Sequence, residues 1–300
     1  MIDGVAASLP EGIVLLDGGM GQELIRRGVN SLWSADALVT APAVVQAVHE
    51  DYLRAGADII TTNTYAAIRE RLEPEGYGER FVELNQLAGL LAQKAREAIG
   101  RDALIAGSLP PLRGSYRPDL IADFHEIEPH YREQAEVLAP YVDLFLCETM
   151  SSAEESKAAA AAAVSTGKPV LISWTLRDDG SAVVRSGESL AEVASNVSHL
   201  PIAGYLVNCC APESVTAAIP QLVALSTVPV GGYANGFDLI PEDWRYETPD
   251  SLPGRRRDLG PDEYAVHVSK WLSEGARVVG GCCEIGPEHI ARLRELVDAA

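Results

Sequence analysis

The stretch "AGYLVNCCAPESVTAAIPQLVALSTVPVGGYAN" at residues 203–235 decides the fold, because two apolar runs flank one amphipathic run. The runs at 203–210 and 228–235 are almost continuously apolar, which is typical of parallel strands covered on both faces. The stretch between them, 212–225, begins with a proline, the residue favoured in the first turn of a helix. The sequence here therefore predicts a strand, a helix and a second strand.

The same alternation extends along the chain in both directions. Strands are predicted at 13–19, 57–64, 103–109, 142–149, 169–175, 203–210, 228–235 and 277–283. Helices are predicted at 42–55, 80–99, 126–140, 153–166, 188–199, 212–225, 261–274 and 287–298. The closed solution for this α/β pattern is a (β/α)8 TIM barrel. An open doubly wound sheet is the alternative, but "DGGMGQEL" after the first predicted strand lacks the G-x-G-x-x-G spacing typical of that fold.

The arrangement of loops predicts where a site would lie. No linker rich in Pro, Gly or Ser divides the chain, so residues 1–300 are expected to form a single domain. Two long irregular segments, 109–123 and 234–260, each follow a predicted strand. In a barrel both would lie at the C-terminal face of the strands, where active sites form.

Charge and hydropathy exclude some classes of function. The chain has 24 Lys and Arg against 43 Asp and Glu, a formal net charge of −19. Such a surface repels nucleic acid and anionic membranes, so neither is an expected partner. The N-terminal residues do not read as a signal peptide, and no apolar run approaches the ~20 residues of a membrane helix. We therefore expect a cytoplasmic protein whose thiols stay reduced.

Four of the five cysteines form two adjacent pairs, Cys209–Cys210 and Cys282–Cys283, and Cys147 is the fifth. All are predicted near the C-terminal ends of strands, which meet at one mouth of a barrel. Zinc prefers thiolate ligands, and a catalytic zinc site keeps one position open. Three cysteines from two strands would meet that requirement, so the pairs favour a metal site.

Strand geometry restricts how each pair can contribute. Neighbouring residues of a regular strand point to opposite faces, so one of Cys209 and Cys210 is expected to point into the barrel wall. Cys282 and Cys283 can reach one metal together only if the chain leaves the strand, and Gly280–Gly281 makes a turn there plausible. A strained disulfide between Cys282 and Cys283 is an alternative. For Cys147 alone, a buried core position is the expected one.

Six motifs near the strand ends resemble the homocysteine S-methyltransferase family. They are "LLDGGMGQEL" (15–24), "DIITTNTY" (58–65), "ETM" (148–150), "LVNCC" (206–210), "GGYANG" (231–236) and "VVGGCCEIGPEHI" (278–290). The resemblance runs from about residue 11 to residue 298 and implies a barrel that binds Zn²⁺ through Cys209, Cys282 and Cys283. Zinc would hold the thiol of homocysteine, which takes a methyl group to become methionine.

The resemblance also implies residues that bind substrate. Glu148 matches the glutamate that holds the substrate amino group, and Asp17 with Gly18 and Thr62 are the other substrate-binding matches. The residue types agree with this, because two carboxylates suit an ammonium group. Tyr233 and Asn235 match the family's seventh-strand element and are expected near the donor or the metal. A methyl donor that reacts readily carries a positive centre, which Trp174 and Tyr233 could attract through cation–π contacts. A place in the barrel wall is an equal alternative for Trp174.

The donor and the acceptor stay open at this stage. The chain has no room for folate and cobalamin modules, so S-methylmethionine or S-adenosylmethionine is the expected donor, with betaine or another methylated onium compound as the alternative. The acceptor is homocysteine or selenohomocysteine. A different class of function is a non-enzymatic zinc-binding or thiol redox-sensing barrel, in which Cys147 or Cys210 closes the metal site as a fourth ligand. The sequence does not indicate an oligomeric state.

Overall fold

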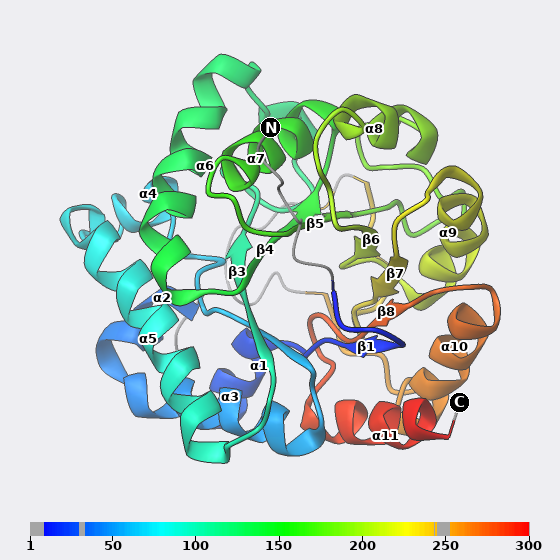
Figure 1. Ribbon diagram of the computed structural model, residues 1–300, viewed down its shortest axis with the longest axis horizontal. Helices are drawn as coiled ribbons and strands as arrows, with labels where there is room; N and C mark the ends of the chain where they lie inside the picture. The colour runs from blue at the N-terminus through cyan, green and yellow to red at the C-terminus, as the bar shows by residue number, and fades with distance from the viewer. Residues whose placement is uncertain (1–8, 30–33, 243, 245–252, 300) are drawn as a thin grey trace.

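The computed structural model describes residues 9–29, 34–242, 244 and 253–299. Eight parallel strands form a central ring, and helices surround it (Figure 1). The strands are β1 Val14–Leu15, β2 Ile59–Thr61, β3 Leu104–Leu109, β4 Leu144–Met150, β5 Val170–Trp174, β6 Gly204–Asn208, β7 Val230–Tyr233 and β8 Val278–Val279. All eight lie within or overlap their predicted ranges, and the predicted (β/α)8 barrel is confirmed.

The first and second strands close the ring. Along the sheet the neighbours run β1-β8-β7-β6-β5-β4-β3-β2, and every pair is parallel. Leu16 then forms a parallel bridge with Ile59, and the amide of Asp17 donates to the carbonyl of Ile59 at 3.0 Å. The open sheet considered as an alternative is therefore not the fold.

The helices follow the predicted alternation, with three short additions. Their bounds are α1 Met20–Arg26, α2 Ser34–Thr40, α3 Pro42–Ala55, α4 Arg69–Leu72, α5 Phe81–Ile99, α6 Phe124–Leu138, α7 Ala153–Val164, α8 Leu190–Val197, α9 Pro212–Leu225, α10 Pro261–Ser273 and α11 Pro287–Asp298. Short 3-10 helices lie at Gly78–Arg80, Pro118–Leu120 and Ala139–Tyr141. The helices α1, α2 and α4 were not predicted, because seven or fewer residues are too short to show a helical period.

Proline and glycine stand at the ends of several helices. Each of α3, α9, α10 and α11 begins with a proline, whose fixed φ suits the first helical position. Gly56 and Gly100 end α3 and α5 in the left-handed conformation, with φ of 105° and 67°. That conformation is costly for other residues, which is why glycine stands there.

Strand alternation divides the core into two layers. The barrel interior contains Leu16, Ile59, Leu146, Leu206, Val278 and their neighbours. A larger layer fills the space between the strands and the helices. In β4, Leu144 and Leu146 face the interior, whereas Phe145 and Cys147 face the helices. This division fixes which side chains can reach the mouth of the barrel.

The two long irregular segments lie where the sequence placed them, at the C-terminal ends of the strands. Segment 109–123 begins at the end of β3, and segment 234–260 follows β7. In the second segment, residues 243 and 245–252 fall outside the described part of the chain. Phe237 and Arg255 form an antiparallel bridge that joins its two described arms. Among the described helices, none combines the length and apolar character needed to cross a membrane.

Candidate metal and substrate site

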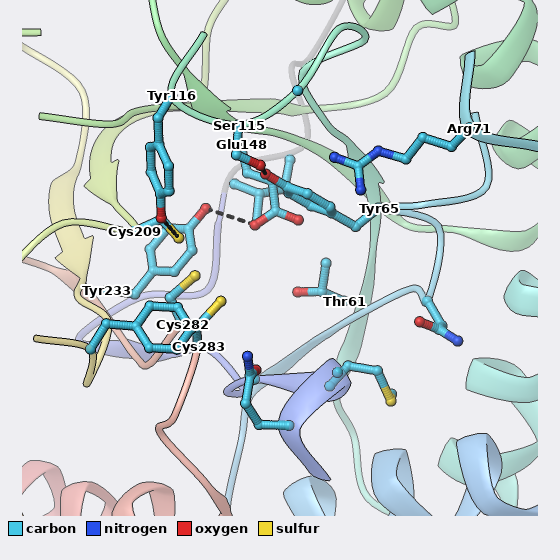
Figure 2. A pocket seen from close by; sticks show the side chains of 18 of the residues that line it. Thr61, Tyr65, Arg71, Ser115, Tyr116, Glu148, Cys209, Tyr233, Cys282 and Cys283 are labelled. Atoms are coloured by element: carbon cyan, nitrogen blue, oxygen red, sulfur yellow. Dashed lines mark hydrogen bonds between the residues drawn. The ribbon is translucent and has the colours of Figure 1, made fainter. Parts of the chain in front are cut away.

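A pocket of about 690 Å³ opens at the C-terminal end of the barrel. Its lining includes Asp17, Glu148, Tyr233 and the three cysteines that the sequence singled out as metal ligands. Both long irregular segments contribute to its wall, for example through Tyr116 and Phe237. Figure 2 shows Tyr116, Glu148, Tyr233 and the three cysteines around this pocket, although they come from distant parts of the sequence.

Three sulfur atoms meet at one side of this pocket. The Sγ atoms of Cys209, Cys282 and Cys283 all lie within 4.8 Å of one another, and Figure 2 shows them together. All five cysteines are free thiols, so the alternative disulfide between Cys282 and Cys283 is not formed. The spacing suits one ion bound by all three sulfurs, because a zinc–sulfur bond is about 2.3 Å long.

Cys282 and Cys283 reach the cluster together because β8 ends before them, at Val279. The Cys282 amide donates to the carbonyl of Ala234 at 2.9 Å, and the Cys283 carbonyl accepts from the amide of Gly236 at 2.8 Å. These two bonds tie the turn to the segment after β7. Strand alternation therefore no longer applies to the pair.

The glycines before this pair act differently from the prediction. Neither Gly280 nor Gly281 adopts a left-handed φ, and the left-handed residue of the turn is Glu284, with a φ of 66°. A Cβ on Gly281 would lie 2.1 Å from Cγ2 of Ile285, and one on Gly280 would lie 2.6 Å from Cβ of Leu16. The glycines are thus needed for close packing rather than for turning the chain.

Cys209 enters the cluster by a different route. The strand β6 ends at Asn208, whose side chain faces the interior, so regular alternation would send Cys209 toward the helices. Cys209 instead has a φ of 51°, and this left-handed turn directs its sulfur into the mouth. Cys210 then points into the layer beneath the helices and is fully buried, which confirms the predicted wall position of one member of the pair.

The remaining cysteines do not join the cluster. Cys147 lies inside β4, faces the helices and is fully buried, which confirms the core position expected for it. Burial raises the pKa of both the Cys147 and the Cys210 thiols above their usual range. Within the described residues the cluster contains three cysteines, so the closed four-cysteine site is not formed.

The cluster favours a thiolate at Cys209. Hydrogen bonds from the thiols of Cys282 and Cys283 hold the pKa of Cys209 well below its usual range, although burial opposes this. A thiolate is the form that binds metals. The arrangement is therefore suited to a cation even before one is bound.

Two buried carboxylates line the pocket beside the sulfurs. Glu148 accepts hydrogen bonds from the Ser108 hydroxyl at 2.5 Å and from the Tyr233 hydroxyl at 3.3 Å. Asp17 accepts from the amide and the hydroxyl of Thr61, at 2.7 and 2.9 Å. Burial raises the pKa of each carboxyl to about 7. No Lys, Arg or His of the described chain pairs with either carboxylate, so an ammonium group would find two partners here.

A buried amide links the carboxylate to the cysteine cluster. Asn208 immediately precedes Cys209, and its Oδ1 accepts from the amide of Thr149 at 2.9 Å and the hydroxyl of Ser173 at 2.7 Å. Its Nδ2 donates to the Thr149 hydroxyl at 2.9 Å. Thr149 follows Glu148 and has a left-handed φ of 61°. Asn208 thus fixes the backbone next to both Glu148 and Cys209.

The residues predicted at the first two strands also line the pocket. Gly18 is needed for close approach, because a Cβ there would lie 2.1 Å from the carbonyl oxygen of Ile285. Thr62 lines the pocket, and its hydroxyl already contacts the Thr64 hydroxyl and the amide of Ser108. Its neighbour Thr61, which the sequence did not single out, is the one bound to Asp17.

Two of the predicted donor neighbours do not line the pocket. Trp174 is fully buried in the layer beneath the helices, where its ring packs 5.5 Å from that of Tyr205. The Oδ1 of Asn235 accepts from the backbone amide of Phe237, and the backbone amide of Asn235 donates to the carbonyl of Cys210. Asn235 therefore shapes the segment after β7, whereas Tyr233 lines the pocket as predicted.

Several pocket residues were not predicted. The hydroxyls of Tyr65 and Ser115 are hydrogen-bonded at 2.7 Å, and the guanidinium carbon of Arg71 lies 5.8 Å from the centre of the Tyr65 ring. The hydroxyl of Tyr116 lies 2.9 Å from Sγ of Cys209. The only sequence signal for Ser115 and Tyr116 was their place in segment 109–123.

Comparison with known proteins gives a consistent result over nearly the whole chain. The family model for homocysteine S-methyltransferase matches residues 14–297. The homocysteine S-methyltransferase of Escherichia coli (strain K12) is 32% identical, with 94% of each chain covered. A selenocysteine methyltransferase from Astragalus bisulcatus is 27% identical, with 95% of this chain and 92% of that protein covered.

A solved structure shows the same similarity in three dimensions. The metallated form of the homocysteine methyltransferase MmuM from Escherichia coli superposes with a TM-score of 0.81 at 31% sequence identity. The match covers 95% of this chain and 96% of that one. A type I 3-dehydroquinate dehydratase from Clostridium difficile, at 11% identity and a TM-score of 0.52, shares the barrel fold alone.

Proposed function

The chain belongs to the homocysteine S-methyltransferase family, and we propose that it moves a methyl group from a small sulfonium compound to L-homocysteine, forming methionine. The proposed donor is S-methylmethionine or S-adenosylmethionine, and residues 1–300 would act as one homocysteine-binding domain. One observation carries the proposal: three thiols from distant strands converge beside two buried carboxylates in a single pocket. Because the reaction uses free thiols, we place it in the cytoplasm, where thiols stay reduced.

We propose Zn²⁺ as the metal and Cys209, Cys282 and Cys283 as its ligands. Three thiolates would leave one tetrahedral position for the substrate sulfur. When bound, zinc would supply a Lewis acid that keeps the substrate thiol deprotonated and therefore nucleophilic. The metallated form in which the relative was solved supports a bound metal.

The amino-acid end of homocysteine would bind between the carboxylates. Asp17 and Glu148 are buried, and each has a pKa raised to about 7. An ammonium group would lower both values and share their negative charge, because an opposite charge nearby favours the ionised form. Ser108 and Thr61 hold the two carboxylates in position through their hydroxyls. These residues would orient the substrate and fix the direction of its sulfur.

The rest of the pocket suits a positively charged methyl donor. Tyr65, Tyr116, Phe237 and Trp244 line it, and aromatic faces attract onium groups. Arg71, across the pocket from the sulfurs in Figure 2, would attract the carboxylate of an amino-acid donor. In the reaction the homocysteine sulfur would attack the methyl carbon. The electron pair of the broken bond would leave with the donor sulfur as a neutral thioether.

A donor panel tests this proposal directly. The purified protein would be given homocysteine with S-methylmethionine, S-adenosylmethionine or betaine, and methionine formation would be followed by chromatography. We expect one zinc per chain and methionine from a sulfonium donor. If only betaine supports turnover, betaine is the donor and the proposed sulfonium donor is wrong. If selenohomocysteine reacts faster than homocysteine, selenohomocysteine is the acceptor.

X-ray absorption separates the enzyme from a non-enzymatic zinc or redox protein. We expect homocysteine to add one sulfur to a three-sulfur zinc shell. A four-sulfur shell that stays unchanged when homocysteine is added would leave no position for substrate, and the methyltransferase proposal would fail.

A further inference from the structure

A buried tyrosine contacts one of the three clustered sulfurs. The hydroxyl of Tyr116 lies 2.9 Å from Sγ of Cys209, and both side chains are buried (Figure 2). Tyr116 reaches this position from segment 109–123, whereas Cys209 follows β6. The contact therefore joins one of the two long irregular segments of the pocket wall to the cysteine cluster.

The ring of Tyr116 is held from several directions. Its backbone has a left-handed φ of 62°, which is unfavourable for a residue with a side chain and persists only where the surroundings impose it. The ring of Trp244 meets it edge-on at 5.6 Å between centroids. The guanidinium carbon of Arg185 lies over its face, 4.3 Å from the centroid. The hydroxyl is thus aimed by packing on both sides of the ring.

Arg185 belongs to a buried ion pair that is also bonded to the backbone of two other segments. It lies 3.5 Å from Asp178, and their side chains are only 5% and 4% exposed. The carboxylate of Asp178 also accepts from the amide of Ala211 at 2.7 Å and from the amide of Ile240 at 2.9 Å. A buried charge that keeps this many partners forms a rigid support. Here the support lies directly behind the Tyr116 ring.

We propose that Tyr116 is a positioning residue for the metal, acting through a hydrogen bond from its hydroxyl to the sulfur of Cys209. The inference rests on the proposed metal site at the three cysteines. A sulfur bound to a metal carries no proton, so the phenol must be the donor of this bond. Tyr116 would thereby fix the direction of the Cys209 sulfur and draw electron density from it. Partners of this kind orient metal ligands and tune the metal they hold.

The hydroxyl and the ring have separable effects. Replacing Tyr116 with phenylalanine removes the hydrogen bond but leaves the ring that Trp244 and Arg185 pack against. A purely structural role of Tyr116 would therefore survive the Tyr116→Phe substitution. A role in positioning the sulfur would not, because only the oxygen contacts Cys209.

The test uses Co²⁺ as a spectroscopic probe in the full-length protein. Metal affinity would be measured by competition with a chelator, and the sulfur-to-cobalt charge-transfer absorption would be recorded. In Tyr116→Phe we expect Co²⁺ affinity to fall by about tenfold or more, as is usual for the loss of an outer partner of a metal ligand. We also expect the absorption to move to longer wavelength, because a thiolate that loses a hydrogen bond gives up its electrons more easily.

Tyr65→Phe is the matched control. It removes a phenol hydroxyl from the same pocket, but that hydroxyl is bonded to Ser115 rather than to a sulfur. Its charge-transfer band should stay at the wild-type wavelength. Thermal unfolding of both metal-free variants would check that each is folded.

The outcomes separate this inference from the proposed function. If the unmodified protein shows cobalt–thiolate absorption and Tyr116→Phe keeps the same affinity and band position, Tyr116 has no positioning role, although the metal site stands. If Tyr65→Phe shifts the band as much as Tyr116→Phe does, the effect is not specific to the contact with Cys209 and the inference fails. If the unmodified protein binds no metal through its cysteines, the proposed metal site fails and the inference fails with it.

Discussion

The mouth of the barrel and the layer between its strands and helices contain the same reactive residue types. Cys283 and Glu148 line the pocket at the mouth, whereas Cys210 and Glu155 are buried beneath the helices. The members of each pair differ in what surrounds them rather than in their chemistry. The comparison teaches that residue type and burial do not by themselves identify a site, and that the position of the side chain relative to the mouth decides.

The two glutamates make this point most clearly. Glu148 is 8% exposed and Glu155 is 4% exposed, and burial raises the pKa of each to about 7. Glu155, in the first turn of α7, accepts a hydrogen bond from the amide of Ser151 at 2.9 Å and so caps the local backbone. Glu148 instead accepts from two hydroxyls at the pocket wall. A raised pKa is therefore found both in the proposed binding group, Glu148, and in a structural one, Glu155.

Replacing one cysteine at the mouth and one beneath the helices should give the largest difference in metal content and activity. We expect Cys283→Ser to abolish metal retention and methyl transfer, because the cluster would lose one of its three sulfurs. Cys210→Ser should keep both, while burial of its hydroxyl lowers the free energy of unfolding by about 1–3 kcal/mol. Elemental analysis, methionine formation and urea unfolding would measure these effects. Full metal content in Cys283→Ser, or loss of metal in Cys210→Ser, would reverse the assignment of the two sides.

The strands and long helices of the barrel could be predicted from the sequence because their signals are local. Strand positions follow from apolar runs, and the bounds of α3, α9 and α11 agree with their predicted ranges, each of which begins at a proline. These signals depend on neighbouring residues only, so they predict strands and helix starts without knowledge of the contacts made by the rest of the chain. The short helices α1, α2 and α4 carry no such signal, because they have too few residues to repeat a pattern.

The site was harder to predict, because it depends on exceptions to the strand pattern. Cys209 points into the mouth only because its backbone is left-handed. The sequence has no glycine at this position that would predict such a turn. Trp174 was expected near the donor, but Leu171 and Ser173 face the interior, so alternation along β5 sends Trp174 toward the helices. Tyr116 lies in a loop without periodicity. Motif order predicted the cysteines, Asp17 and Glu148, whereas Tyr116 could be placed only from the structure.

Neutralising Glu148 at the mouth and Glu155 beneath the helices should separate an effect on substrate binding from an effect on the fold. We expect Glu148→Gln to lower kcat/KM for homocysteine by about 10- to 100-fold, which corresponds to losing one charge-assisted hydrogen bond. Glu155→Gln should leave kcat/KM within about twofold, because its remaining oxygen can still accept from the Ser151 amide. Steady-state kinetics with the donor saturating would measure both. Equal losses in the two variants would show that burial, not position, sets the effect.

The pH dependence should also differ between the two sides. The ionised forms of Asp17 and Glu148 would bind the ammonium group, and their pKa values of about 7 predict that KM for homocysteine rises as pH falls from about 8 to 6. One such group predicts a rise of about tenfold per pH unit below its pKa. Glu148→Gln should make this profile shallower, and a KM that stays flat over the range would contradict the assignment.

Glu155, with a pKa raised by a similar amount, should affect stability instead. Its folded pKa of about 7 lies above the ordinary value of 4.5, so the folded state holds a proton that the unfolded chain has lost. The contribution of Glu155 to the free energy of unfolding therefore falls as pH rises between these two values. Glu155→Gln should remove this contribution to the pH dependence of the free energy of unfolding, which urea unfolding at several pH values would measure. The pH profile of KM for homocysteine should stay unchanged, which steady-state kinetics would measure.

The smallest effect on activity is expected at Trp174, the one aromatic residue that the sequence placed near the donor and the structure does not. Its ring is fully buried beneath the helices, and its Nε1 has no hydrogen-bond partner among the described residues. Trp174→Phe should therefore leave KM for the donor within about twofold and lower the free energy of unfolding by ~1–3 kcal/mol, as expected for lost core packing. Phe237→Leu, which alters an aromatic side chain of the pocket wall, is the matched change on the mouth side and should raise the donor KM. If the donor KM rises severalfold in Trp174→Phe but not in Phe237→Leu, the donor binding site depends on the helix-facing layer rather than on the mouth.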